Sequence, residues 1–382
     1  CDILKHTTMK TGDKTMKKIH RTLSLFTVAA MCAALLCSCG AVSDSSQTDS
    51  SSKADTTTTA DTTADTTTAG EASSTASATS APDSSVSDSS SAVTDDTKTN
   101  GITPAMWKVT SPEGNTMVML GSFHALKDEC YPLPEAVTNA YNNADILAVE
   151  CDITSTSEDG EYMKNLMKQM LYNDNTKLSQ HISEEAYSAL QTYLGYWGMD
   201  ISALEVYRPW AISSTLDTLL IQDADFDSEK GLDNYLLTTA HADGKEIYEV
   251  ESVDFQMNLL INFSDDIYDL MFRSYEGETK ESQKQALEDL YTAWKSGDIE
   301  TFLEEDNEEE LAGYTEEDKK IAEDYNNQML YDRNKNMAKA AEDLMSQGKN
   351  VFYVVGAAHY AGEGGIIDLL EKDGYTAERV QY

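Results

Sequence analysis

The sequence predicts an α/β fold (mixed α+β), with a central, mostly parallel sheet, helices packed around it and a long helical insertion. Short apolar runs recur along residues 101–382, and tracts with helical periodicity separate most of them. Strands that alternate with helices are typical of a sheet covered by helices. One helical tract, between about residues 161 and 242, is much longer than a single connection needs, which indicates the insertion.

The first elements form a hairpin followed by a β-α-β unit. Residues 107–109 and 117–120 flank the turn-rich segment Ser-Pro-Glu-Gly-Asn-Thr, which predicts two antiparallel strands. Residues 134–144 then have the periodicity and the boundary residues typical of a helix, and residues 145–150 have the composition of a buried strand.

The rest of the domain continues the alternation. The long helical tract is interrupted near residues 173–175 and at Gly198. The later elements are expected as a helix at 233–242, a strand at 245–250, helices between 253 and 347, a strand at 350–355, a helix at 364–372 and a strand at 376–380.

Residues 1–38 comprise upstream residues and an expected lipoprotein signal peptide. Basic residues from Lys17 to Arg21 precede the apolar run 23–36, which is short for a membrane-spanning helix. The segment Leu36-Cys37-Ser38-Cys39 resembles a lipobox, so Cys39 is expected to carry lipid. An ordinary cleaved signal with incidental cysteines is the alternative. We therefore expect an extracytoplasmic protein, lipid-anchored to a bacterial cell membrane, whose only membrane contact is this lipid.

Residues 39–100 are expected to be a disordered linker, because Ser, Thr, Asp and Ala dominate them and large apolar residues are scarce. Residues 101–382 are long enough for one domain with a sizeable core. The formal net charge of −39 makes nucleic acid an unexpected partner and favours cationic partners or metal ions. The oligomeric state is left open.

Four predicted strands are followed by a residue that can bind metal or move protons: His124, Glu150, Glu251 and His359. The apolar composition of all four strands predicts that they are buried. Ligands bind at the carboxyl ends of parallel strands, so these side chains are expected to meet. Both histidines follow the same frame, Gly-Ser-Phe-His and Gly-Ala-Ala-His, in which glycine permits a sharp turn. A one-residue register change at Glu251 would place a different glutamate inward.

Other candidates are weaker. His181 and His241 read as ordinary hydrogen-bonded histidines. Cys130 and Cys151 lack CxxC spacing, and a disulfide between them is left open. Strand alternation predicts that Cys151 points away from the neighbouring Glu150.

Paired GxxH motifs near the two ends of a domain, with a glutamate ending the strand after the first, resemble the TraB/GumN/PrgY family and its animal relatives, the Tiki proteins. The resemblance covers about residues 102–382. It includes segments 207–210, 231–233 and 249–252 with Gln256, and 332–334. It implies a metal-dependent, peptidase-like activity with His124, His359 and Glu150 at the site.

Two neutral imidazoles and a carboxylate suit a divalent metal, namely Mn²⁺, Co²⁺ or Zn²⁺, which makes water a usable nucleophile. In this hypothesis Glu251 is a further ligand or the general base, and Asp233 orients a ligand. Arg208 and Arg333 bind a carboxylate or stabilise an oxyanion. The expected substrate is a peptide or protein.

Three alternatives stay open. The first is a non-enzymatic protein that binds or sequesters a peptide signal such as a pheromone, as the resemblance to PrgY suggests. The second is a haem or metal carrier, because two histidines in one crevice can hold iron. The third is a surface domain whose histidines only satisfy hydrogen bonds.

Overall fold

The computed structural model describes residues 100–154, 160–303 and 314–382. The predicted signal peptide, Cys39, the linker up to residue 99 and the acidic run 304–310 lie outside these residues. Within the described part of the chain, no helix has both the length and the apolar character needed to cross a bilayer.

A six-stranded sheet organises the described residues, in the order β4-β3-β5-β2-β1-β6. The four strands β4, β3, β5 and β2 run parallel to one another, whereas β1 pairs antiparallel with β2 and with β6. The predicted α/β class with a mostly parallel sheet is therefore confirmed. The strands are β1 (Met106–Thr110), β2 (Thr116–Ser122), β3 (Ile146–Val149), β4 (Glu246–Glu249), β5 (Val351–Gly356) and β6 (Thr376–Arg379).

The central strands are buried on both faces, as their composition predicts. Every residue of β3 and β5 is buried, in keeping with the apolar runs of parallel strands covered by helices. The prediction that β4 is also buried is wrong, because three of its four residues are exposed. Since β4 lies at the edge of the sheet, its sequence Glu-Ile-Tyr-Glu meets solvent.

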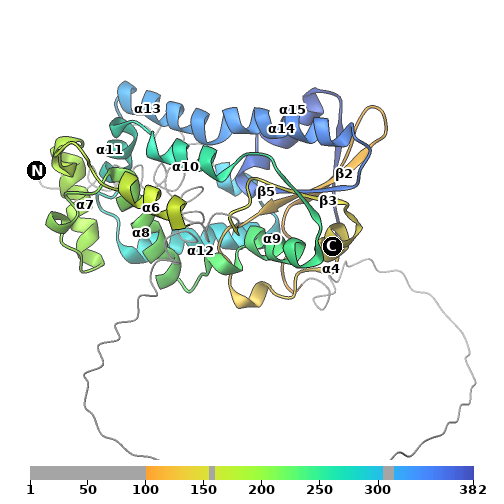
Figure 1. Cartoon of the computed structure of the whole chain (residues 1–382), viewed down its shortest axis with the longest axis horizontal. Coiled ribbons are helices and arrows are strands. Elements are labelled where there is room, and N and C mark those ends of the chain that lie inside the picture. Colours follow the sequence, from red (N-terminus) through yellow and green to blue (C-terminus); the bar gives the residue numbers. More distant parts are fainter. Residues whose placement is uncertain (1–99, 155–159, 304–313) are drawn as a thin grey trace, which may run out of the picture. The chain divides into compact units, whose positions relative to one another are not determined.

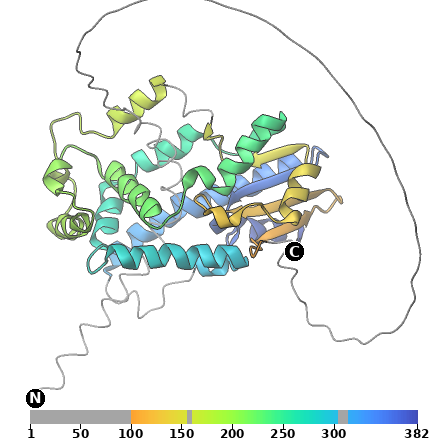
Figure 2. The same ribbon diagram turned by 90° about the horizontal axis from the view of Figure 1, so that it is seen from below.

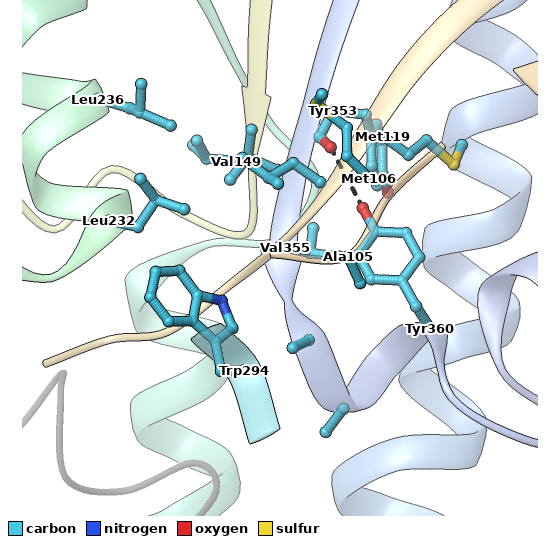
Figure 3. Close-up of a cluster of buried hydrophobic side chains, with 14 of the residues drawn as sticks. Ala105, Met106, Met119, Val149, Leu232, Leu236, Trp294, Tyr353, Val355 and Tyr360 are labelled. Carbon is cyan, nitrogen blue, oxygen red and sulfur yellow. Dashed lines mark hydrogen bonds between the residues drawn. The ribbon is translucent and has the colours of Figure 1, made fainter. Parts of the chain in front are cut away.

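Helices cover both faces of the sheet (Figure 1). Figure 1 shows α14 and α15 on one side and α4, α9 and α12 on the other. Their apolar residues share one core with the strands, including Trp294 of α12, which is fully buried (Figure 3). In the same core, Leu232 and Leu236 of α9 lie near Val149. These helices are α4 (Glu135–Asn143), α9 (Leu232–Asp243), α12 (Lys280–Ser296), α14 (Asp332–Met345) and α15 (Ile366–Lys372).

Most of the predicted helical insertion packs with later helices of the chain in a second apolar cluster, whereas its last helix, α9, belongs to the first. Trp210 and Phe272 are among the fully buried side chains of the second cluster. The long helix α12, cyan in Figure 2, contributes its apolar residues to the first cluster. Lys280 near its start pairs with Asp223, and Trp294 near its end contacts the sheet. The other helices are α6 (Gly160–Gln169), α7 (Glu184–Tyr196), α8 (Pro209–Asp223), α10 (Val253–Ile261), α11 (Asp265–Arg273) and α13 (Glu316–Asn326).

Candidate active site

The parallel strands bring the predicted site residues together around Gly356, at the end of β5. A methyl group built on Gly356 would lie 3.1 Å from Glu150 Oε1, 3.3 Å from His124 Nε2 and 3.6 Å from His359 Cδ2. All three residues proposed as metal ligands therefore surround one backbone position. A side chain there would force the nearer of these neighbours to shift by a few tenths of an ångström.

The first GxxH segment is held by three close contacts to its backbone. The Trp294 indole N–H donates to the Gly121 carbonyl at 3.0 Å. A methyl group on Gly231 would lie 2.1 Å from the carbonyl oxygen of His124, so only glycine permits this approach. The Leu232 amide also donates to the Phe123 carbonyl at 3.0 Å. The start of α9 is thereby held against His124.

This approach places Asp233 directly beside His124. His124 Nδ1 lies 2.7 Å from Asp233 Oδ2, and the Ser122 hydroxyl donates to Asp233 Oδ1 at 2.6 Å. Burial lowers the pKa of His124, but the charge and hydrogen bond of Asp233 outweigh it and raise the pKa to about 9. Asp233 therefore contacts His124, the residue that it was predicted to orient.

The second histidine has a different environment. His359 is 2% exposed, and its Nδ1 lies 2.6 Å from Asn334 Oδ1. Burial and the nearby Arg333 guanidinium lower the pKa of His359 to about 3, despite the opposing effect of Glu150. The ring is therefore neutral near physiological pH in the metal-free protein.

Glu150 accepts three hydrogen bonds from the chain. The Gly356 amide donates to Oε1 at 2.7 Å, whereas Gln256 Nε2 and Arg333 Nη2 donate to Oε2 at 2.9 Å and 2.7 Å. Burial raises the pKa of Glu150, but Arg333, the two histidines and the Gly356 N–H hold it well below its usual range. Glu150 is thus a stable carboxylate.

Arg333 joins Glu150 to the second predicted glutamate. Its Nε donates to Glu251 Oε1 at 2.9 Å and its Nη2 to Glu251 Oε2 at 2.8 Å. Gln256 Nε2 also donates to Glu251 at 2.7 Å. The remaining Nη1 donates to the carbonyl of Met329, in the π-helical turn η7 (Asn327–Tyr331) that precedes α14. One buried cation therefore lies between two carboxylates.

A small pocket opens beside this group, with a volume of about 30 Å³. Such a space holds a water molecule or a single ion. Cys151 lines the pocket together with Glu150, and its thiol donates to Gln256 Oε1 at 3.4 Å. The prediction that Cys151 points away is therefore wrong, because β3 ends at Val149 and alternation does not continue beyond it. The lining residues are His124, Glu150, Cys151, Ile153, Ser228, Asp233, Asn234 and Gln256.

Other predicted residues lie elsewhere or have other partners. Arg208 precedes α8 in the helical insertion and donates to the Ile261 carbonyl at 3.1 Å, so the contacts of the described residues do not join it to the site. Cys130 and Cys151 are not joined in a disulfide, which answers the question that the sequence left open. His181 and His241 each pair with an aspartate, as expected of ordinary histidines.

Sequence reasoning did not assign two residues that the structure brings to the site, Gln256 and Asn334. Both belong to segments that carry the family resemblance, and this was their signal. Their amide side chains bind the carboxylates and His359, contacts that depend on how α10 and α14 pack.

The residues fit a divalent metal in part. In the described ranges, no three His, Cys, Asp or Glu side chains are already arranged to hold an ion. Yet Nε2 of His124 lies near Gly356, Nε2 of His359 lies 3.7 Å from Glu150 Oε1, and each ring's Nδ1 contacts an oxygen. This second contact is typical of metal-binding histidines. Glu150 is a weaker candidate ligand than the two histidines, because its oxygens already accept hydrogen bonds from Arg333, Gln256 and Gly356.

Comparisons with known proteins find distant relatives of the chain. The chain is 26% identical over 157 residues to the uncharacterized protein YbaP of Escherichia coli (strain K12), which covers 41% of this chain and 56% of YbaP. It is 24% identical over 293 residues to a metalloprotease TIKI homolog of Nematostella vectensis, covering 65% and 61% of the two chains. It is 26% identical over 161 residues to metalloprotease TIKI1 of Xenopus tropicalis, covering 38% and 32%.

The alignments span about half to three-fifths of the YbaP and Nematostella proteins. No solved structure matches the chain. The model of the TraB/PrgY/gumN family matches residues 105–379, which include both GxxH segments and every strand of the sheet. The chain therefore belongs to the TraB/PrgY/gumN family.

Proposed function

We propose that this protein is a metal-dependent, peptidase-like hydrolase that acts on peptides or proteins. The observation that carries the proposal is the arrangement around Gly356, where two histidines and a carboxylate surround one point. The relationship to proteins named metalloproteases supports the reaction class at a distant level. The acidic chain, with a formal net charge of −39, favours both a cation in the site and a cationic substrate.

The chain's residues have distinct tasks in this proposal. His124 and His359 would hold Mn²⁺, Co²⁺ or Zn²⁺ through Nε2, with Glu150 as the third ligand. When bound, such a metal supplies Lewis acidity, which makes water a usable nucleophile near neutral pH. Asp233 orients His124 and keeps a proton on its Nδ1. Arg333 keeps Glu150 ionised.

Glu251 acts through Arg333 in this proposal, in place of the predicted role of ligand or general base. Both of its carboxylate oxygens accept hydrogen bonds from the guanidinium. Glu251 therefore positions Arg333 between the two carboxylates.

A non-enzymatic peptide binder is the second candidate. It is favoured by the hydrogen bonds that already occupy Glu150, because they compete with a metal for its oxygens. The haem carrier is disfavoured by the pocket volume of about 30 Å³, because pockets for ligands as large as haem occupy about 300 to 1,000 Å³.

Metal content of the purified protein separates these candidates. The wild type and a His124→Ala/His359→Ala variant would be dialysed against Mn²⁺, Co²⁺ or Zn²⁺ and analysed by mass spectrometry. A His181→Ala/His241→Ala variant is the matched control, because it removes two histidines that pair with Asp265 and Asp152. We expect near-stoichiometric metal and peptide cleavage in the wild type and control only. Peptide binding without metal or cleavage would favour the binder.

We further propose that lipid on Cys39 holds the protein outside the cytoplasmic membrane. The expected result is that the wild type sediments with membranes and that Cys39→Ala leaves the protein in the soluble fraction. Equal sedimentation of both proteins would refute the anchor without bearing on the metal site.

A further inference from the structure

We infer that Asn334 is a positioning residue that fixes which ring nitrogen of His359 faces the site. Asn334 is 2% exposed and contacts His359 Nδ1 through Oδ1 at 2.6 Å. The inference extends the proposed function, but its principal test measures the ring itself and needs neither metal nor turnover.

The orientation of the Asn334 amide follows from its second contact. Asn334 Nδ2 donates to the carbonyl oxygen of Gly364 at 2.9 Å. A carbonyl oxygen can only accept, so the amide group NH₂ must face Gly364. The amide oxygen must then face His359. The usual uncertainty between the two ends of an asparagine side chain is removed by this neighbour.

The amide oxygen in turn determines the state of the imidazole. Because Asn334 Oδ1 can only accept, His359 Nδ1 must carry the hydrogen. In the neutral ring the other nitrogen, Nε2, then has a lone pair, and this atom lies 3.7 Å from Glu150 Oε1. The opposite tautomer would set two lone pairs against each other across the 2.6 Å contact. Asn334 thus makes Nε2 the available donor atom.

An amide performs this task without adding charge. The site already has the carboxylates of Glu150, Glu251 and Asp233, and Arg333 is the cation that contacts the first two. An aspartate at position 334 would accept the same hydrogen bond but would add a further buried negative charge. Comparing the wild type with Asn334→Asp therefore separates the effect of the accepting oxygen from the effect of its charge.

Long-range ¹H–¹⁵N spectra of metal-free protein labelled at histidine report the tautomer directly, with His359→Ala used to assign the signal. We expect one tautomer in the wild type, with hydrogen on Nδ1. Asn334→Ala should produce a mixture or move the hydrogen to Nε2, which faces the negative charge of Glu150. Asn334→Asp should keep hydrogen on Nδ1, because its carboxylate accepts in place of the amide.

Asp368→Ala is the matched control. Asp368 Oδ2 accepts from the Gly364 amide at 2.7 Å, so this variant loosens the same segment without contacting His359. If Asn334 only supported that segment, Asp368→Ala would change the tautomer as much as Asn334→Ala. That outcome, or an unchanged tautomer in Asn334→Ala, would overturn the inference. An unchanged tautomer in Asp368→Ala supports it.

Metal affinity provides the link to function. If the wild type binds Co²⁺ or Zn²⁺, Asn334→Ala should weaken binding by about 10- to 100-fold, as expected for loss of a partner that holds a ligand histidine. Equal affinity would overturn the positioning role. If the wild type binds no metal, the proposed hydrolase fails and the tautomer result alone decides whether Asn334 positions the ring.

Discussion

Replacing Arg333 with methionine should destabilise the protein strongly near neutral pH. Arg333 is 2% exposed and donates three hydrogen bonds to Glu150 and Glu251, at 2.7, 2.8 and 2.9 Å. Methionine keeps an apolar chain of similar length but leaves both carboxylates without their cation. Because removal of one partner from a buried ion pair typically costs about 3 to 5 kcal/mol, we expect a loss of that size in unfolding free energy.

The pH dependence of this loss has a defined sign. In the wild type the pKa of Glu150 is lowered, so its stabilising contribution is present above pH 4.5 and declines as pH falls below that value. In Arg333→Met, Glu150 loses the cation that lowers its pKa, so its buried carboxylate takes up a proton at higher pH than in the wild type. The difference between the proteins should therefore shrink as pH falls from 7 toward 4.

Urea unfolding in the presence of a chelator measures this difference at each pH. Arg273→Met is the matched control, because Arg273 also contacts two carboxylates, Asp269 and Asp318, but its side chain is 29% exposed. Its loss should be nearer 1 kcal/mol. A loss in Arg333→Met that equals the control at pH 7, or that grows on acidification, would refute the reasoning.

Three further predictions concern the glycines and histidines of the site. Gly231→Ala should lower the unfolding free energy by about 1 to 3 kcal/mol, measured in urea, because its methyl group would meet the His124 carbonyl at 2.1 Å; wild-type stability would contradict this. Gly356→Ala should weaken Co²⁺ binding by displacing Glu150 or His124, and unchanged affinity would argue against a site there. In metal-free protein, NMR titration should show His359 neutral down to about pH 4 and His124 protonated at pH 7.5. Accordingly, the contribution of His359 to stability should fall as pH drops from 6.5 toward 3, and that of His124 should be lost as pH rises from 6.5 toward 9.

Much of the fold could be predicted because periodicity and turn residues are local signals. The hairpin of β1 and β2 and the buried runs of β3 and β5 follow from composition and punctuation alone. The exposure of β4 did not follow, since Glu-Ile-Tyr-Glu can lie at an edge or beside a covering helix. Its position depends on the order of strands in the sheet, which the local sequence does not encode.

The site could be predicted to the extent that parallel strands determine it. His124, Glu150 and His359 come together because each follows a strand of the parallel set. Arg208 and Arg333 were equivalent in the sequence, since each is an arginine in a segment that resembles the family. Packing separates them: Arg333 of α14 contacts the two carboxylates, whereas Arg208 donates to a carbonyl of the helical insertion. Long-range packing of helices against strand ends is not visible in local patterns.

The two GxxH segments show how equal motifs become unequal sites. Their glycines and strands place both Nε2 atoms near Gly356, but the partner of each Nδ1 comes from elsewhere in the chain. Asp233 at the start of α9 places a negative charge beside His124. Asn334 of α14 accepts a hydrogen bond from His359 but is itself uncharged. Burial lowers the pKa of both histidines, but the Asp233 carboxylate more than offsets this effect at His124. The difference between the two histidines therefore resides in the helices that cover the sheet, since the repeated motif supplies only their common position.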